Sequence, residues 1–247
     1  MIINPLRIAI LGGCLNSGYH VIRLNQLYHR IMARSLEQLL GRTVRVTLGR
    51  FDTHQHSGMI KRVAELITAC KPNMLLFQIR PDFLWGLYSA AWLTRDGSGF
   101  FRLRKNPHLQ YGNIWPQGME ESINPMHRFA AQNLQISQML GVTQQAHGGL
   151  ARRLKDLKIL AEKENISLGL ISPIFGTYYH PQFQKFAREK IFRIITESNL
   201  PMVDLMTNAE MISHHYWADA FHPNVAGHQL AAQIATQTLL PILKNAR

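Results

Sequence analysis

The chain has 247 residues, 46% of them hydrophobic and 17% charged, and a net charge of +12 with its histidines neutral. This length suits one large α/β domain, and the composition excludes a disordered chain. We expect no membrane-spanning helix, because no apolar run approaches the ~18 uninterrupted residues that one requires.

Short hydrophobic runs alternate with amphipathic segments along most of the chain, which predicts alternating strands and helices. We expect strands at residues 6–11, 44–48, 73–79, 167–171 and 202–205, and helices at residues 19–40, 59–69, 150–163, 181–198 and 224–243. This order favours a mainly parallel sheet that is covered on both faces. We therefore predict an α/β fold, a three-layer α/β/α sandwich with a five-stranded sheet, in one domain over residues 1–247.

One segment interrupts this alternation and is expected to be an insertion after the third strand, at about residues 83–147. It contains three tryptophans and several basic residues, among them Arg102 and Arg104. It has room for one or two helices, such as residues 126–140. Long irregular insertions often form lids or binding loops, and a packed decoration of the domain is the alternative.

The loop before the last helix carries Asp219 and His222, which are followed by Pro223 and Asn224. Histidine can take a proton near neutral pH because its unperturbed pKa is ~6.5, and a nearby carboxylate can hold its ring in one tautomer. Pro223 restricts the chain as proline does at a first helical position. The pair indicates a general base with its orienting carboxylate or, alternatively, a local cap at the start of the helix.

The turn after the first strand carries the candidate nucleophile. Cys14 follows Gly12 and Gly13 there, and the N–H groups at the start of a helix favour a thiolate. The alternative for Cys14 is a small buried residue. Ser17 is a second candidate nucleophile, although it could equally cap the following helix, and Cys70 is expected to be structural.

Two more segments follow the ends of predicted strands: residues 51–53 read Phe-Asp-Thr, and residues 78–82 read Gln-Ile-Arg-Pro-Asp. Residues 11–19 read Leu-Gly-Gly-Cys-Leu-Asn-Ser-Gly-Tyr, and residues 219–224 read Asp-Ala-Phe-His-Pro-Asn. In chain order, the four segments resemble the blocks of the SGNH (GDSL) hydrolase superfamily, in particular its small bacterial esterase and thioesterase branch. The last block matches most closely. The resemblance implies a flavodoxin-like fold and a catalytic triad.

The blocks also depart from the family pattern. The serine position holds Cys14, and the second-block glycine, an oxyanion donor through its backbone, is Phe51. The third-block asparagine, a side-chain donor, is replaced by Asp82, or by Arg80 if the block is shifted. An ionised aspartate cannot donate a hydrogen bond, and losing one oxyanion donor typically lowers the rate ~10²–10³-fold. Arg80 or Gln78 could replace the missing donor.

Two functions follow from the resemblance. The first is an acyl hydrolase (esterase or thioesterase) or acyltransferase with a Cys14–His222–Asp219 triad, acting on an acylated carbohydrate, lipid or small ester. The second is a catalytically inactive protein of the same fold that binds an anionic carbohydrate or a partner, because three of the four blocks are altered. The positive charge favours an acidic substrate. Nucleic acid is the least favoured of the predicted partners, because no nucleic-acid module signature is present.

The spacing of the histidines and the number of cysteines bear on metal binding and on the location of the protein. The pairs His54 and His56, and His214 and His215, lack the i, i+4 spacing of a zinc pair. We therefore expect neither a metal site nor a cofactor. Two cysteines fit a reducing compartment, and the first apolar run lacks the flanks of a signal peptide. The expected location is cytoplasmic.

Overall fold

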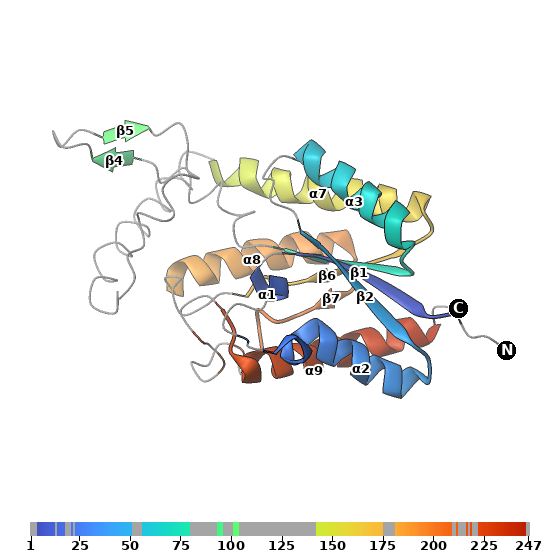
Figure 1. Ribbon diagram of the computed structural model, residues 1–247. Coiled ribbons are helices and arrows are strands. Elements are labelled where there is room, and N and C mark those ends of the chain that lie inside the picture. Colours follow the sequence, from blue (N-terminus) through green and yellow to red (C-terminus); the bar gives the residue numbers. More distant parts are fainter. Residues whose placement is uncertain are drawn as a thin grey trace.

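The computed structural model describes residues 4–12, 14–17, 21, 23–50, 56–79, 93–95, 101–103, 142–174, 181–208, 211, 216, 218 and 222–245. These residues form a three-layer α/β/α sandwich with a parallel sheet in the middle (Figure 1). The predicted fold class is confirmed. No helix in this part of the chain is long and apolar enough to cross a membrane.

The central sheet has five parallel strands in the order β2-β1-β3-β6-β7. Their bounds are β1 Leu6–Gly12, β2 Val44–Arg50, β3 Met74–Gln78, β6 Ser167–Ile171 and β7 Met202–Val203. The strand order changes direction between β1 and β3, where Leu11 pairs with Phe77. In open α/β sheets, ligands bind beyond the carboxyl ends of the strands at such a switch point.

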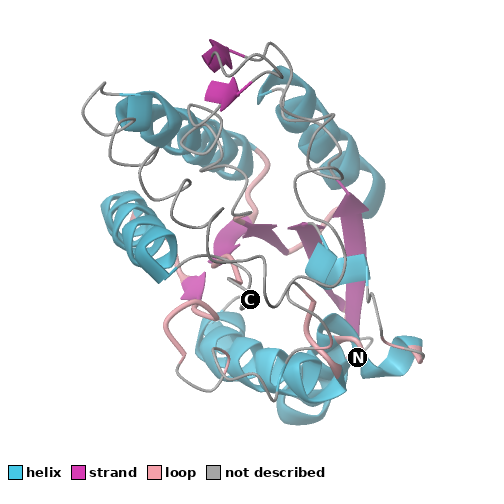
Figure 2. Ribbon diagram, turned by 90° about the vertical axis from the view of Figure 1, so that its left-hand side faces the viewer, coloured by secondary structure: helices cyan, strands magenta, loops and turns pink. Residues whose placement is uncertain are grey.

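The helices cover both faces of the sheet (Figures 1 and 2). On one face lie α2 (Tyr28–Leu40) and α9 (Val225–Asn245), and on the other lie α3 (His56–Cys70), α7 (Val142–Lys163) and α8 (Pro181–Ser198). Two short elements, α1 (Cys14–Ser17) and η1 (Leu24–Gln26), connect β1 to α2.

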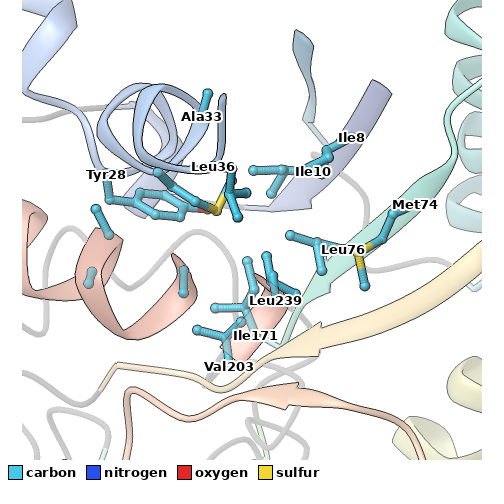
Figure 3. Close-up of a cluster of buried hydrophobic side chains, with 14 of the residues drawn as sticks. Ile8, Ile10, Tyr28, Ala33, Leu36, Met74, Leu76, Ile171, Val203 and Leu239 are labelled. Carbon is cyan, nitrogen blue, oxygen red and sulfur yellow. The ribbon is translucent and has the colours of Figure 1, made fainter. Parts of the chain in front are cut away.

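Alternation along the strands divides the core between the two faces. On β1, the buried side chains of Ile8 and Ile10 pack with α2 and α9 (Figure 3), while Ala9 and Leu11 pack on the opposite face. The strand is buried nearly throughout, as the near-continuous hydrophobic run predicts.

The predicted helix over residues 19–40 is wrong in its first third, because α2 begins only at Tyr28. Leu24, which fits the helical spacing, lies in η1 with 74% of its surface exposed. Leu27 has extended backbone angles of φ −71° and ψ 139° and precedes the helix. Ser17 therefore does not cap α2, because Leu27 occupies the N-cap position.

The start of α7 also differs from the prediction. Helix α7 begins at Val142, not at Leu150, so helical structure extends into the expected insertion despite two glycines. Within residues 83–141, the described parts are β4 (Leu93–Arg95) and β5 (Phe101–Leu103), which pair antiparallel. The predicted helix over residues 126–140 lies outside the described residues.

Strand β7 ends at Val203, two residues before the predicted end. The next residue, Asp204, leaves the strand and accepts hydrogen bonds at Oδ1 from the N–H groups of Met206 and Thr207, at 3.0 Å each. This side chain therefore favours a turn where hydrophobicity alone predicts more strand.

Candidate functional site

The candidate site lies at the carboxyl edge of the sheet, at the switch point between β1 and β3. Strand β1 ends at Gly12 and is followed by Cys14, the first residue of α1. The neighbouring strand, β3, ends at Gln78, one residue after the pair formed by Leu11 and Phe77. Figure 1 shows α1 and the start of α9 at this edge, opposite the end at which both termini lie.

The end of β1 depends on a glycine. A β-carbon at Gly12 would lie 2.3 Å from Asn16 Nδ2 and 2.4 Å from Gln78 Oε1, far inside van der Waals contact. Asn16 and Gln78 are 5% and 6% exposed, so two buried amides converge over the space that Gly12 leaves open. The absence of a side chain at this position lets α1 approach β3.

Asn16 is also bonded to α2, because Tyr28 donates from its hydroxyl to Asn16 Oδ1 at 2.7 Å. Tyr28 is buried, and burial raises the pKa of its hydroxyl. The group is therefore a protonated donor at neutral pH. Asn16 Nδ2 has no hydrogen-bond partner among the described residues, and it is the amide nitrogen that faces Gly12 and Gln78.

Tyr28 in turn connects α2 to α9. Its backbone N–H donates to His228 Nδ1 at 3.3 Å, and its ring stacks on the imidazole at a centroid distance of 6.3 Å. This N–H belongs to the first residue of α2, and Leu27 supplies no side-chain cap. His228 therefore caps α2 from a different helix, satisfying a donor that every helix start leaves unpaired.

Burial keeps two histidines of this region neutral. Desolvation lowers the pKa of His228 to about 4. Desolvation, with smaller repulsion from Arg30 and His228, lowers the pKa of His29 to about 4. A neutral His228 is what the bond from Tyr28 requires, because a protonated imidazole has no acceptor nitrogen.

His222 lies in a bend directly before α9 and is half-buried. Its carbonyl accepts a hydrogen bond from Ala218 N–H at 2.8 Å, and Tyr216 O accepts one from Asn224 N–H at 2.9 Å. A β-carbon at Gly227 would lie 2.3 Å from Tyr216 O and 2.8 Å from Pro223 Cβ. The first turn of α9 therefore supports the loop that carries His222.

Asn224 caps α9, since its Oδ1 accepts from Gly227 N–H at 2.9 Å. The helix starts at Val225, one residue after the predicted start, so Pro223 precedes both the cap and the helix. Asn224 therefore pairs one of the donors at the start of α9, and the alternative prediction, a local cap by the Asp219–His222 pair, stays a prediction because Asp219 lies outside the described residues.

The structure describes some of the remaining predicted site residues and not others. Gln78 is buried at the end of β3, and Cys14 opens α1. Four residues lie outside the described residues: Phe51, Arg80, Asp82 and Asp219. The side chains of Cys14 and Ser17 lie outside them as well.

Other titratable and polar groups of the described chain do not add to the site. Its described residues contain no group of three or more His, Cys, Asp or Glu that could hold a metal ion. Cys70 is half-buried at the end of α3, and burial raises the pKa of its thiol. Ser172 is fully buried and accepts hydrogen bonds from Leu205 N–H and Met206 N–H at 2.8 and 2.9 Å, so its hydroxyl connects β6 to the chain after β7.

Sequence reasoning missed Asn16, Tyr28 and His228. Tyr28 and His228 lie within helical patterns, and Asn16 lies in the turn that carries the candidate nucleophile, so the residue type alone does not indicate a role for any of the three. A usable signal for Asn16 was its place two residues after the candidate nucleophile, and for His228 its place among the apolar residues of the last helix. Neither signal identifies Tyr28 as the residue that connects them.

No family model matches the sequence, and no curated protein sequence matches it. The fold does match solved structures. A family 3 carbohydrate esterase from Clostridium thermocellum aligns with a TM-score of 0.58 at 12% identity, covering 98% of each chain. The psychrotrophic esterase EstA from Pseudoalteromonas sp. aligns with a TM-score of 0.53 at 14% identity, covering 97% of this chain and 99% of that one.

A third structure, assigned as a GDSL-like lipase from Parabacteroides merdae, aligns with a TM-score of 0.56 at 14% identity and covers 94% of both chains. The chain has an SGNH-like fold. At these identities the likeness shows the architecture alone, and it agrees with the flavodoxin-like strand order β2-β1-β3-β6-β7. Within this SGNH-like fold, α1 and the loop before α9 occupy the edge where ligands of such sheets bind.

Proposed function

We propose that the protein is an acyl hydrolase or acyltransferase that acts on ester or thioester bonds through Cys14 and His222. The observation that carries the proposal is the position of these residues. Cys14 opens α1 directly after β1, and His222 precedes α9 at the same edge of the sheet. The Gly227 N–H in the first turn of α9 is paired by Asn224, so this donor does not depend on His222.

In the proposed reaction, His222 takes the proton of the Cys14 thiol, and the sulfur forms a bond to the substrate carbonyl carbon. The resulting tetrahedral intermediate collapses as the bond to the leaving oxygen or sulfur breaks, and His222 returns the proton to that atom. Water, or an acceptor hydroxyl in a transferase, then attacks the acyl-cysteine with His222 again as base. The bond between the acyl carbon and the Cys14 sulfur breaks, and His222 returns the proton to that sulfur. Asp219 orients the imidazole.

The oxyanion donors are the backbone N–H groups of Cys14 and Phe51, supplemented by Arg80 or Gln78. Gln78 has one observation in its favour, because its buried amide lies next to Gly12, two residues from Cys14. Asp82 would repel the developing charge if ionised. Its carboxylate therefore has to lie away from the oxyanion for this mechanism to operate.

We propose an acylated carbohydrate or another small ester as substrate. This follows from the esterases that share the architecture, one of which is a carbohydrate esterase, and from the net charge of +12, which favours an acidic substrate. We propose a cytoplasmic location on the basis of the low cysteine content.

The test is incubation with an activated ester such as p-nitrophenyl acetate, followed by intact-mass measurement and peptide mapping. If deacylation is the slower step, we expect an acetyl adduct on Cys14 in the wild type. The same adduct should form much more slowly in His222→Ala. Cys14→Ala should carry no adduct at that peptide. A wild type without an adduct and without turnover would contradict the proposal.

The changed blocks favour a second candidate, a binding protein that keeps the fold without catalysis. The motivating observation is that Cys14, Phe51 and Asp82 stand where the family has serine, glycine and asparagine. A thermal-shift screen with acidic oligosaccharides separates the candidates. Equal stabilisation of the wild type and Cys14→Ala by one ligand, with no turnover, supports binding, whereas turnover that needs Cys14 contradicts it.

A further inference from the structure

A continuous path of hydrogen bonds joins the two elements that carry the proposed catalytic pair. Tyr28 donates from its hydroxyl to Asn16 Oδ1 at 2.7 Å, and from its backbone N–H to His228 Nδ1 at 3.3 Å. The backbone N–H of His228 then donates to Asn224 O at 2.9 Å. The path begins two residues after Cys14 and ends two residues after His222.

We propose that Tyr28 and His228 are positioning residues, which hold α1 and the start of α9 at the separation that the Cys14–His222 pair needs. This inference rests on the proposed function. Neither residue is assigned contact with substrate. They act through Asn16 at one end and through Asn224, which caps α9 and bonds to the His222 loop, at the other.

The path is built to be rigid, because its three polar side chains are shielded from water. Asn16, Tyr28 and His228 are 5%, 1% and 1% exposed. The Tyr28 ring also stacks on His228 with the planes 17° apart, so each side chain has few alternative positions. A reaction that depends on well-aligned groups benefits from such a support, since a displacement of about 1 Å can lower a rate about 10²-fold.

An ordinary packing role would not require this arrangement. Desolvating hydroxyl, amide and imidazole groups costs free energy, and apolar side chains of similar volume fill a core at lower cost. The same α2–α9 layer does so elsewhere, with Met32, Leu36 and Leu239. The polar groups of the path lie at the end of the layer that adjoins α1 and the His222 loop.

The test uses the rate at which iodoacetamide alkylates Cys14, followed on the Cys14 peptide by mass spectrometry so that Cys70 does not contribute. Iodoacetamide reacts with the thiolate, so a nearby His222 accelerates the reaction at neutral pH. We expect His222→Ala to lower the rate at pH 7 about tenfold. Tyr28→Phe, which removes only the hydroxyl, should lower it about three- to tenfold.

Thr236→Val is the matched control. Thr236 is a buried residue of α9 whose hydroxyl donates to Ala232 O at 2.7 Å, so this variant also removes one buried hydroxyl while keeping the shape. It should leave the alkylation rate of Cys14 unchanged. A wild-type rate in Tyr28→Phe would overturn the positioning role and leave the catalytic pair intact. No effect of His222→Ala would overturn the pair, and the positioning role with it.

A second pair of variants covers the case in which Tyr28→Phe does not fold. His228→Asn keeps an acceptor near the position of Nδ1, and His228→Leu removes it. We expect the alkylation rate of His228→Asn to lie within about twofold of the wild-type rate and that of His228→Leu to be lower than the wild-type rate by about three- to tenfold. Equal rates in the two His228 variants would contradict the proposal.

Discussion

The two faces of the sheet are packed by different chemistry. The face under α3, α7 and α8 is closed by a large hydrophobic cluster that includes Val63, Phe77 and Leu157. The face under α2 and α9 also buries His29 and His228, and at its carboxyl end it adjoins the amides of Asn16 and Gln78. Among the side chains that the structure describes, α3, α7 and α8 contribute no buried histidine or amide. The mixed face is less stabilising because burying polar groups costs free energy. Its polar groups connect α1, which Cys14 opens, to the start of α9, which follows His222.

The largest change in stability is expected from a substitution on the apolar face. Phe77→Ala removes a fully buried ring from β3 and should lower the free energy of unfolding by about 3–5 kcal/mol. Urea denaturation measures the loss. Well below the melting temperature, the alkylation rate of Cys14 in the folded variant should equal that of the wild type. A large change in that rate would mean that the two faces are not separate in function.

Acid should act mainly through the mixed face. The pKa values of His29 and His228 are lowered to about 4 in the folded protein, so the unfolded chain binds more protons between pH 6.5 and pH 4. Stability is therefore full above about pH 6.5 and falls as the pH drops towards 4, by at most roughly 3 kcal/mol for each histidine.

Urea denaturation at several pH values between 4 and 7 measures this dependence. His228→Asn removes one of the two groups and should flatten the curve, whereas Phe77→Leu on the apolar face should lower it without changing its slope. A pH dependence that is the same in His228→Asn and in the wild type would contradict the assignment.

Gly227→Ala tests whether the first turn of α9 supports the His222 loop. The new methyl group would lie 2.3 Å from Tyr216 O, a backbone atom that cannot rotate away, so we expect a loss of about 1–3 kcal/mol and a slower Cys14 alkylation. An alanine is otherwise favoured over glycine in a helix by ~1 kcal/mol. A stabilised variant would show that the loop does not rest on α9.

Gly169→Ala is a control for this prediction. Its methyl group would meet the ends of two flexible side chains, Leu76 Cδ2 at 3.0 Å and Met74 Cε at 3.1 Å, and would lie at an ordinary contact distance of 3.5 Å from Pro201 O. We expect a smaller loss of stability and no change in the alkylation of Cys14.

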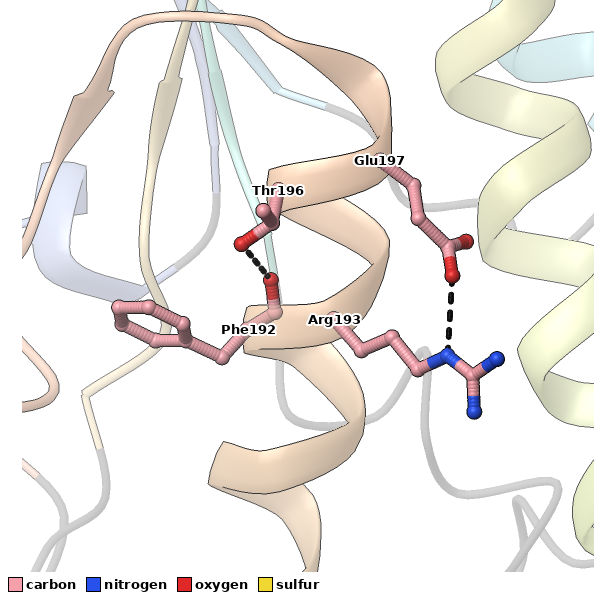
Figure 4. A network of polar contacts seen from close by, with 4 residues as sticks. All are labelled: Phe192, Arg193, Thr196 and Glu197. Atoms are coloured by element: carbon pink, nitrogen blue, oxygen red, sulfur yellow. Dashed lines mark hydrogen bonds and ion pairs between the residues drawn. The ribbon is translucent and has the colours of Figure 1, made fainter.

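The smallest effect is expected at the outer surface of α8. Arg193 Nε and Glu197 Oε1 form an i, i+4 ion pair at 2.9 Å, and both side chains are more than half exposed (Figure 4). Arg193→Ala should cost about 0.3–0.5 kcal/mol, an effect that 0.5 M salt should largely remove. A loss above 1 kcal/mol would mean that the pair contributes more than an exposed pair usually does.

The sequence predicted the sheet well because buried parallel strands are hydrophobic throughout, as in Ser167–Ile171, whose bounds are confirmed. It predicted the start of α8 correctly and that of α9 to within one residue, but it placed the start of α2 too early. The start of α2 depends on a cap that His228 supplies from 200 residues away, and no local pattern contains that information. Leu24 fits the helical spacing but is exposed, because spacing cannot report which tertiary partner is present.

The candidate site shows the same limit. Cys14 and His222 are identifiable because each belongs to a short segment of unusual chemistry at the end of a predicted strand or the start of a helix. Asn16, Tyr28 and His228 are not, because their significance lies in hydrogen bonds between three separate elements. The role of Asp219 stays a prediction.

The central claim is that Cys14 and His222 form a reactive pair. The most direct measurement is the distance from Cys14 Sγ to the nearer ring nitrogen of His222 in a crystal structure. We predict a distance of about 4 Å or less, allowing for a looser geometry without substrate. A thiol that points into the sheet, with the imidazole beyond reach of a hydrogen bond, would contradict the claim.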